Sequence, residues 1–290
     1  MEHHMVSEVL LKQWSGSKGH KQLVGFDKAT RRRRDTGPRG LCKISTDELR
    51  PADKDVFEAK WDSIERQCEP ILKGINQRRG QQILNGASSA CIRDLLSVHV
   101  ARSFNYRERH RSRMHEALQS LELSLVPMEF LTELYRAQHG GLYPPYSQDR
   151  TVVEAEWRIH LEVEFDQKSY SSDAMMGIFG PIRMEMERRP LAIVDVRDAE
   201  STLLIGDCPV LPLAVPDGLA DEPFGPTVAA YFLPLGRHHA AFTVLEPRPQ
   251  LNETSVTYFN RLQIGHAIHT IVWSPDDECE SFVNVSLDAS

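Results

Sequence analysis

The sequence lacks the compact signatures by which many enzymes are recognised. It has no Gly-rich phosphate loop, no Gly-x-Ser-x-Gly nucleophile elbow and no His-Glu-x-x-His zinc motif. Its apolar runs fall well short of the ~20 residues that a membrane helix needs. The first residues, Met1 to Met5, contain neither the basic segment nor the apolar segment of a signal peptide. We therefore expect a cytoplasmic protein that does not cross a membrane.

Cysteine is scarce as well: there are five, an odd number, and no two are close in sequence. This usage predicts reduced thiols rather than a disulfide framework or a zinc ribbon. With 290 residues, of which 41% are hydrophobic and 26% charged, the chain can build a globular core without covalent staples. The net charge of −7 disfavours non-specific nucleic-acid binding by the whole molecule, but it leaves room for a local basic groove.

Apolar spacing predicts that the first two-thirds of the chain is mainly helical. Between residues 46 and 78, apolar residues recur at intervals of four and three, which places them on one helix face. Pro70 falls inside this pattern, so we expect a kink or a break there. Further helices are expected over 80–118, 128–138, 150–168, 172–188 and, later in the chain, 253–270.

Strand patterns dominate after Pro190. They predict an α+β fold, in which a mainly helical first two-thirds packs on an antiparallel sheet of C-terminal strands and an N-terminal hairpin. Residues 1–275 would form a single α+β domain, followed by a polar, acidic tail at 276–290. The hairpin is expected over 22–34, and the C-terminal strands at 192–196, 202–205, 228–233, 241–245 and 271–273, with a proline-rich loop ending at Pro226.

One carboxylate stands at the end of a predicted strand. Apolar residues lead directly to Gly206 and Asp207, and Pro209 prevents the strand from continuing. Sites are often built from acids at strand ends, but an aspartate in a turn also commonly bonds backbone N–H groups. The sequence leaves both interpretations of Asp207 open.

A set of short motifs suggests a family. His4-Met5-Val6-Ser7 precedes an apolar segment ending at Trp14, and His99-Val100-Ala101-Arg102 falls in a predicted helix. Further elements are Phe26-Asp27, Glu58 and Glu65, Gly206-Asp207-Cys208-Pro209, Pro234-Leu235, and Asn260 before Ala267. Together these resemble the bacterial and fungal family known as domain of unknown function 4238. That family has His-x-x-Pro and Gln-x-x-Arg where this chain has Ser7 and His99. The resemblance extends from His4 to about Trp273 and implies no particular activity.

His99 and Arg102 lie three residues apart, so they share one face of an otherwise apolar helix. A buried arginine needs a carboxylate or several carbonyl partners, and we predict that Arg102 meets Asp207. His99 would lie near the same point, and His4 could join if the N-terminal segment packs nearby. Such a cluster could hold a phosphate and transfer a proton, or it could be a structural clamp between helices and sheet.

Two other groups have the residue types of metal sites. Glu58, Asp62, Glu65 and Glu69 form an acidic stripe that could bind Mg²⁺ or Mn²⁺, although a solvated helix face is the commoner cause of such spacing. Glu65 is the member most expected to turn inward. His266 and His269 are three residues apart, and a metal site would need a third ligand, which the His238-His239 pair in a predicted turn could supply, although chance exposure is the commoner cause of such a pair. A divalent metal such as Mg²⁺ therefore stays a possible cofactor, and no metal ligand is assigned.

Arginines crowd the helix from Arg102 to Arg113, with Phe104, Tyr106 and His110 among them. Basic residues interleaved with aromatic ones suit RNA or single-stranded DNA, so nucleic acid or a nucleotide is the expected partner. Glu108 and Glu116 dilute the positive charge. A solvated helix end and a protein partner are the alternatives.

These features support two hypotheses of different classes. In the first, the chain is a hydrolase of nucleic acid or nucleotides, such as a toxin or phage-defence effector. Its candidate catalytic residues are Asp207, His99 and His4, and its candidate substrate-binding residues are Arg102, Tyr106 and Asn260. In the second, the chain is a non-catalytic binding or scaffold module in which the same polar residues only join helices to sheet. The sequence leaves it uncertain whether the chain is an enzyme.

Overall fold

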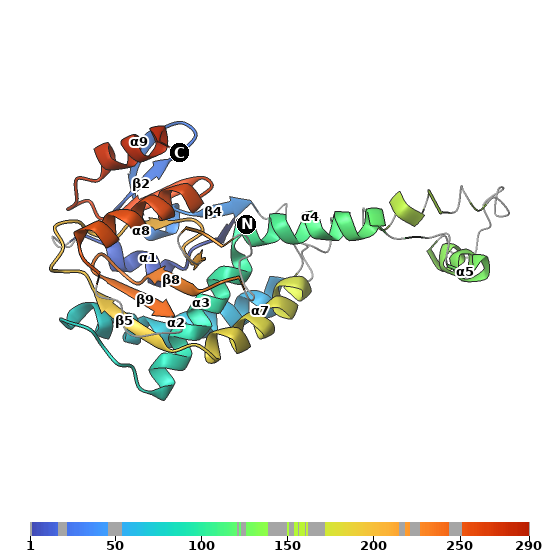
Figure 1. Ribbon diagram of the computed structural model, residues 1–290, viewed down its shortest axis with the longest axis horizontal. Helices are drawn as coiled ribbons and strands as arrows, with labels where there is room; N and C mark the ends of the chain where they lie inside the picture. Colours follow the sequence, from blue (N-terminus) through green and yellow to red (C-terminus); the bar gives the residue numbers. More distant parts are fainter. Residues whose placement is uncertain are drawn as a thin grey trace.

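The computed structural model confirms the α+β class (Figure 1). It describes residues 2–16, 22–45, 54–120, 122, 126–138, 150, 154–155, 157–159, 161, 172–214, 218–220, 227–243 and 251–289. The α-helices in this part of the chain are α1 (Glu8–Leu11), α2 (Lys54–Gln77), α3 (Gly86–Arg102), α4 (Phe104–Ser120), α5 (Met128–Gln138), α7 (Ser172–Glu187), α8 (Glu253–His266) and α9 (Glu280–Asp288).

The strands form two four-stranded antiparallel sheets rather than one. One has the order β3-β2-β10-β6, so the N-terminal hairpin does pair with C-terminal strands as expected; the other has the order β5-β9-β8-β7, and β1 pairs with β4. The strands are β1 (Glu2–His4), β2 (Leu23–Asp27), β3 (Arg32–Thr36), β4 (Lys43–Ser45), β5 (Leu191–Asp195), β6 (Ile205–Gly206), β7 (Leu211–Leu213), β8 (Ala230–Pro234), β9 (His239–Thr243) and β10 (Thr270–Trp273).

Strands β8 and β9 are buried on both faces of the second sheet. Because side chains alternate along a strand, Leu233 and Ala241 face the cluster formed with α2, α3 and α7, whereas Phe232 and Phe242 face α8. Phe232 stacks on Phe259 of α8 with ring centroids 4.3 Å apart. Helices thus cover both faces of this sheet, and α8 also packs against β2 and β10 through its C-terminal half.

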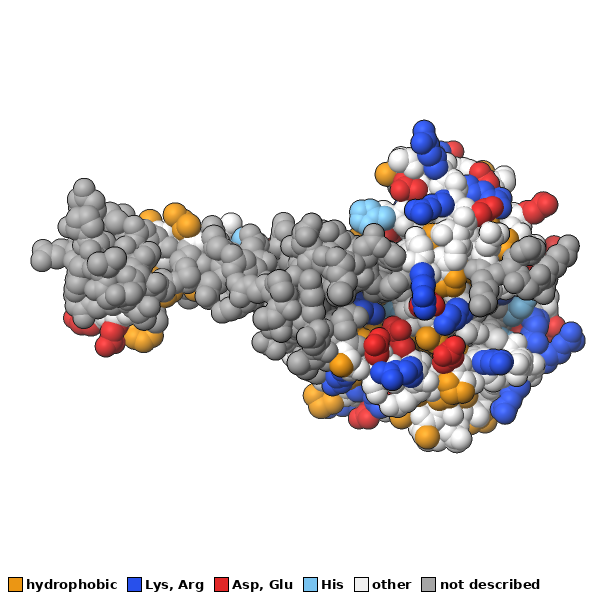
Figure 2. All heavy atoms as spheres, turned by 180° about the vertical axis from the view of Figure 1, so that it is seen from behind, with side chains coloured by type: hydrophobic (Ala, Val, Ile, Leu, Met, Phe, Trp, Pro, Cys, Tyr) orange, Lys and Arg blue, Asp and Glu red, His pale blue; other side chains and the backbone are white. Residues whose placement is uncertain are grey.

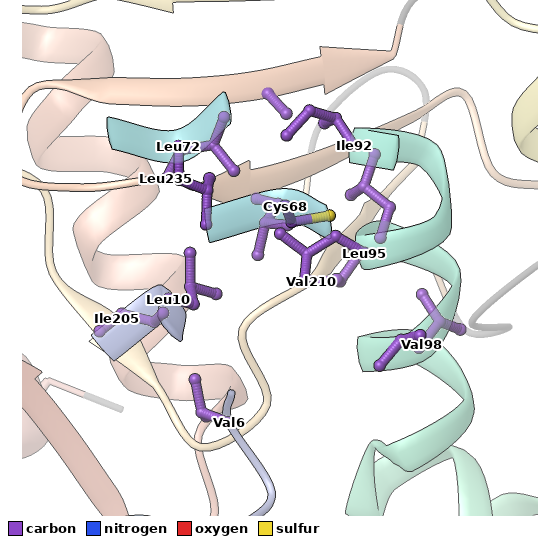
Figure 3. Packing of buried hydrophobic residues seen from close by; sticks show 14 of the residues in the cluster. Val6, Leu10, Cys68, Leu72, Ile92, Leu95, Val98, Ile205, Val210 and Leu235 are labelled. Atoms are coloured by element: carbon purple, nitrogen blue, oxygen red, sulfur yellow. The ribbon is translucent and has the colours of Figure 1, made fainter. Parts of the chain in front are cut away.

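The largest hydrophobic cluster joins parts of the chain that are far apart in sequence (Figure 3). Helix α2 contributes Cys68 and Leu72, and α3 contributes Ile92 and Leu95. The other labelled residues come from the N-terminal segment, the end of α3 and the C-terminal third: Val6, Leu10, Val98, Ile205, Val210 and Leu235. This cluster fixes α3, which carries two of the predicted site residues.

Helix α2 differs from the sequence prediction in two respects. It continues through Pro70 to Gln77, so the predicted break does not occur. Cys68 and Cys91 form a disulfide between α2 and α3, with Cα atoms 5.9 Å apart. The expectation that all thiols are free is wrong for this pair, because the packing of two helices brings together cysteines that are distant in sequence. Cys42, Cys208 and Cys279 are not part of a disulfide.

The long helical region predicted over 80–118 is two helices. Helix α3 ends at Arg102, and Ser103 has a non-helical ψ of 131° before α4 begins at Phe104. Helix α4 projects away from the body, and α5 lies at the far end of this arm (Figure 1). There, Trp157 Nε1 donates to the Leu131 carbonyl at 3.1 Å. The predicted helix at 128–138 is confirmed, and most of the helix predicted at 150–168 lies outside the described residues.

Two features of the C-terminal third also correct the prediction. Strand β7 lies within the expected proline-rich loop; Pro212 is tolerated there because β7 is an edge strand, with β8 as its neighbour. The segment expected as a polar, acidic tail contains α9, whose Val283 is buried against Trp273 and Phe26. No described helix is long and apolar enough to cross a membrane.

Candidate functional site

Asp207 follows strand β6 and is 5% exposed. One oxygen of its carboxylate accepts a hydrogen bond from the backbone N–H of Ile268 at 2.8 Å. The other accepts from the N–H groups of His269 at 2.8 Å and Thr270 at 3.1 Å. The Asp207 N–H in turn donates to the Thr270 carbonyl. Asp207 therefore accepts hydrogen bonds from backbone N–H groups, as the aspartate of an Asx-turn does. However, these N–H groups belong to the distant turn between α8 and β10 and not to the residues next to Asp207.

Lys28 secures the same turn from the other side. Its ammonium donates to the carbonyl oxygens of Ile264, at 2.6 Å, and Ala267. Burial lowers the pKa of Lys28, and the charge of Asp207 opposes that effect. The Lys28 ammonium thus binds carbonyl groups at the C-terminal end of α8, and the Asp207 carboxylate binds the N–H groups that follow. Both side chains satisfy backbone groups that the end of the helix leaves unpaired.

Arg102 does not pair with Asp207, so that prediction is wrong. Its Nη1 lies 3.6 Å from Glu65 Oε1, and its guanidinium lies over the Trp61 ring at 5.2 Å. Trp61 and Glu65 are one turn apart on α2, so the face of α3 that carries Arg102 packs on α2 and meets its carboxylate there. Glu65 does turn inward, as predicted, and both side chains of the pair are largely buried.

His99 is fully buried, and both of its ring nitrogens are used. Nδ1 lies 2.8 Å from the Leu95 carbonyl, and Nε2 lies 3.2 Å from the backbone N–H of Ser7. A neutral ring fits both contacts if Nδ1 donates and Nε2 accepts. Burial lowers the pKa of His99 to about 4; the bond to Leu95 opposes this shift, and Arg102 adds to it.

This shift predicts an acid-sensitive fold. The folded-state pKa lies below the ordinary value of 6.5, so the unfolded chain takes up the His99 proton first as the pH falls. Stability is therefore complete above about pH 6.5 and declines toward pH 4, and His99 alone accounts for a loss of about 2 kcal/mol between pH 7 and pH 5. Glutamine can also accept from Ser7 and donate to Leu95, so His99→Gln should fold and show a smaller loss. Urea unfolding at both pH values measures it.

The matched control for this measurement is His269→Gln, at an exposed position. We expect its unfolding free energy to depend on pH as that of the unmodified protein does. An equal pH response in His99→Gln and the unmodified protein would contradict the assignment.

Asn260 and Gln263 lie three residues apart on α8 and are both buried. Asn260 accepts from the N–H of Leu204 at 2.9 Å and donates to the Thr202 carbonyl at 2.8 Å. Gln263 accepts from the N–H of Gly206 at 3.0 Å and donates to the Pro209 carbonyl at 2.7 Å. The two side-chain amides thus hydrogen-bond the backbone of residues 202–209, where a neighbouring strand would otherwise pair. Because these side chains take the place of a strand partner, the strand predicted over 202–205 is reduced to β6.

The model of a family described as "Protein of unknown function (DUF4238)" matches residues 2–277 of the chain. The chain belongs to the DUF4238 family. Neither the curated proteins nor the solved structures contain a match. The polar residues described above therefore lie in the part of the DUF4238 chain that the family model covers.

The two positions at which the DUF4238 chain departs from the motifs quoted above contact each other. Ser7 stands where proline is expected, and its backbone N–H donates to His99, which stands where glutamine is expected. Proline has no N–H and could not make this bond. Ser7 also caps α1, since its hydroxyl accepts from the N–H of Leu10. Of His4 only the backbone is described; it pairs with Lys43 in the β1–β4 ladder.

The arginine-rich segment is split between body and arm. Arg102 is buried at the end of α3, whereas Arg109 and Arg113 are exposed on α4. Tyr106 is 6% exposed, and burial raises the pKa of its hydroxyl to about 12, so it is not displayed for stacking on a base. The side chains of Arg107 and Arg111 lie outside the described residues.

A narrow crevice lies where α4 leaves the body. It is lined by Ser103, Asn105, Arg109 and His266, among others, and its volume of about 10 Å³ holds no more than a water molecule. The Asn105 amide donates to the His266 carbonyl at 3.0 Å. Burial, and next the charge of Arg109, lower the pKa of His266 to about 4, so its ring is neutral near pH 7.

Metal ligands are not gathered in the described part of the molecule, where no group of three or more His, Cys, Asp and Glu side chains could hold an ion. In the acidic stripe of α2, Glu65 pairs with Arg102, and Asp62 and Glu69 are exposed. The Glu58 side chain lies outside the described residues. His266 and His269 lack a third ligand there.

Sequence reasoning missed Gln263 and a second polar network around Asp195, Arg197 and His239. Gln263 could have been found, because it repeats the amide of Asn260 one turn later on the same helix face. Asp195 is the last residue of strand β5, just as Asp207 stands directly after β6. An aspartate at a strand end was therefore the sequence feature that could have pointed to this network.

Proposed function

We propose that this DUF4238 chain is a non-catalytic binding module, with single-stranded nucleic acid along α4 as its ligand. One observation carries the first part: the polar groups of Asp207, His99 and Asn260 are all bonded to backbone. Both carboxylate oxygens, both ring nitrogens and both amide atoms have such partners. A group that acts on a substrate must be within hydrogen-bond reach of it, and these three are turned toward the fold.

The choice of ligand rests on the exposed arginines of α4. Arg109 and Arg113 are four residues apart, which corresponds to about 6 Å along one side of a helix. Arginine binds phosphate through a planar fork of donors, and a flexible single strand can adjust its phosphates to such a row. The crevice beside Arg109 is too small to admit a base, so we expect contacts to the sugar–phosphate backbone.

One face of the body offers less to a polyanion than α4 does. On the face seen in Figure 2, basic and acidic side chains are interspersed over the body, so no extended basic patch forms there. With a net charge of −7, long-range attraction to nucleic acid is absent for the molecule as a whole. We therefore expect weak, salt-sensitive binding confined to α4, in a protein that we still expect in the cytoplasm.

Fluorescence anisotropy with a labelled oligo-uridine and an oligo-thymidine tests this proposal. Two phosphate contacts predict that log K falls with log salt concentration with a slope of about −1.4. In Arg109→Gln/Arg113→Gln the slope should approach zero and the affinity should fall at least about tenfold at low salt.

The matched control is Arg32→Gln/Arg34→Gln, which removes two exposed arginines from β3 and changes the net charge equally. It should bind as the unmodified protein does. Equal weakening in both double variants would assign the effect to net charge alone, and an absence of binding at low salt would reject nucleic acid as the ligand.

The hydrolase hypothesis remains the alternative. Its toxin form predicts that expression of the unmodified protein slows bacterial growth and degrades RNA or DNA, and that Asp207→Ala relieves both effects.

A further inference from the structure

A polar pocket of about 500 Å³ opens between the end of α2 and the end of β5. Its lining includes Arg79, Gln81, Asp195, Arg197, Asp198 and Leu251. This volume falls in the range of small-molecule sites, which extends from about 300 to 1,000 Å³. The pocket shares none of these residues with α4 or with the polar set around Asp207.

Arg197 is held at the wall of this pocket by a buried network. Its Nε lies 3.0 Å from Asp195 Oδ1, and its Nη2 lies 2.9 Å from Asp195 Oδ2. Asp195 also accepts from the N–H of Gly80, whose φ of +78° suits glycine. Although burial alone would raise it, the hydrogen bonds from Arg197 and Gly80 lower the pKa of Asp195 to about 2.

His239 supports Arg197 from behind and is 1% exposed. Its Nε2 lies 3.0 Å from Arg197 Nη2 and 3.1 Å from the Arg78 carbonyl oxygen, and its Nδ1 lies 3.3 Å from the Asn76 side-chain oxygen. In the tautomer with Nδ1 protonated, Nδ1 donates to Asn76 and Nε2 accepts from Arg197. Burial lowers the pKa of His239 to about 4, so near pH 7 the ring is neutral and can accept from the guanidinium. The arginine thus keeps a fixed position without competition from a second cation.

Donors remain at the pocket for a ligand. Within the described chain, Arg197 Nη1 makes no hydrogen bond, and the exposed guanidinium of Arg79 makes neither a hydrogen bond nor an ion pair. Two guanidinium groups at one pocket are suited to a phosphate or another small oxyanion. Asp198 is exposed and can accept from hydroxyl groups, and Leu251 supplies an apolar wall.

We propose that this pocket binds a small phosphate monoester that carries hydroxyl groups, such as a nucleotide or a sugar phosphate. Arg79 and Arg197 would hold the phosphate, and Asp198 and Gln81 would bond the hydroxyl groups. Asp195 and His239 are positioning residues, because they reach the ligand only through Arg197. Their carboxylate and ring hold the guanidinium in place before the ligand arrives, which reduces the entropic cost of binding.

Isothermal titration calorimetry on the full chain tests this site with four probes: adenosine monophosphate, ribose 5-phosphate, ribose and inorganic phosphate. We expect the two phosphate esters to bind, inorganic phosphate to bind more weakly, and ribose not to bind. Arg79→Gln should weaken ester binding about tenfold, the effect of one charge-assisted contact. Asp198→Ala should weaken ester binding, because it removes the acceptor for the hydroxyl groups, and it should not weaken the binding of inorganic phosphate.

Arg78→Gln is the matched control, since the neighbouring arginine is also exposed and its side chain is not part of the pocket wall. It should bind the esters within about twofold of the unmodified protein. No heat from either ester up to about 5 mM would overturn the proposal. Ester binding that Arg79→Gln and Arg78→Gln affect equally would overturn it too, because the ligand would then lie elsewhere.

Discussion

Asp207→Ala should lower the free energy of unfolding by about 2–4 kcal/mol. The substitution leaves three backbone N–H groups, those of residues 268–270, without their charged acceptor. These N–H groups are partly exposed, so water can replace some of the lost hydrogen bonds. The loss of stability is therefore smaller than it would be for fully buried N–H groups. For a chain of this size the melting temperature should fall by roughly 3–7 °C.

Asp207→Asn provides the matched variant. Its side-chain oxygen can still accept hydrogen bonds, but the amide nitrogen cannot, so we expect a loss about half that of Asp207→Ala. Thermal melts and urea unfolding measure both. A melting temperature of Asp207→Ala equal to that of the unmodified protein would contradict a structural role for this carboxylate, since functional residues are often replaced at no cost in stability.

Arg102→Ala should cost about 3 kcal/mol, near the lower end of the range for breaking a buried ion pair. It leaves Glu65 in a site where its side chain is only 15% exposed, and it removes the guanidinium that lies over Trp61. Glu65→Gln removes the charge from the other partner and should cost less, because the amide keeps its size and can still accept from the arginine.

A double-mutant cycle separates the pair from its surroundings. Arg102→Met/Glu65→Gln removes both charges of the pair, and we expect a stability within about 1 kcal/mol of the unmodified protein. Additive losses in the double variant, measured by urea unfolding, would show that Arg102 and Glu65 do not depend on each other.

Local patterns predicted the elements that one stretch of chain determines. The hairpin of β2 and β3, helices α5 and α7, and strands β5 and β10 lie within a few residues of their predicted places, because each has a clear period and clear ends. The break at Ser103 was missed because neither glycine nor proline marks it. Strand β7 was missed because Pro212 argues against a strand until the sheet order makes β7 an edge.

The candidate site was predicted less well, because partners are chosen by packing. The inward turn of Arg102 followed from its apolar neighbours, and its need for a carboxylate followed from its charge. Two carboxylates could satisfy it, and only the packing of α2 on α3 decides for Glu65 over Asp207. Ser7 and His99 are 92 residues apart in sequence, so no local sequence pattern could have predicted their contact.

The most direct test of the structural role of Asp207 is an incubation of labelled RNA, single-stranded DNA and nucleotides with the unmodified protein and with Asp207→Asn. It should include Mg²⁺ and use a temperature at which melts show both proteins folded. If the polar set only holds the fold together, both proteins should leave every substrate intact, and both should bind the oligonucleotides with the same affinity. Cleavage by the unmodified protein that folded Asp207→Asn has lost would contradict that conclusion and assign Asp207 to a catalytic site.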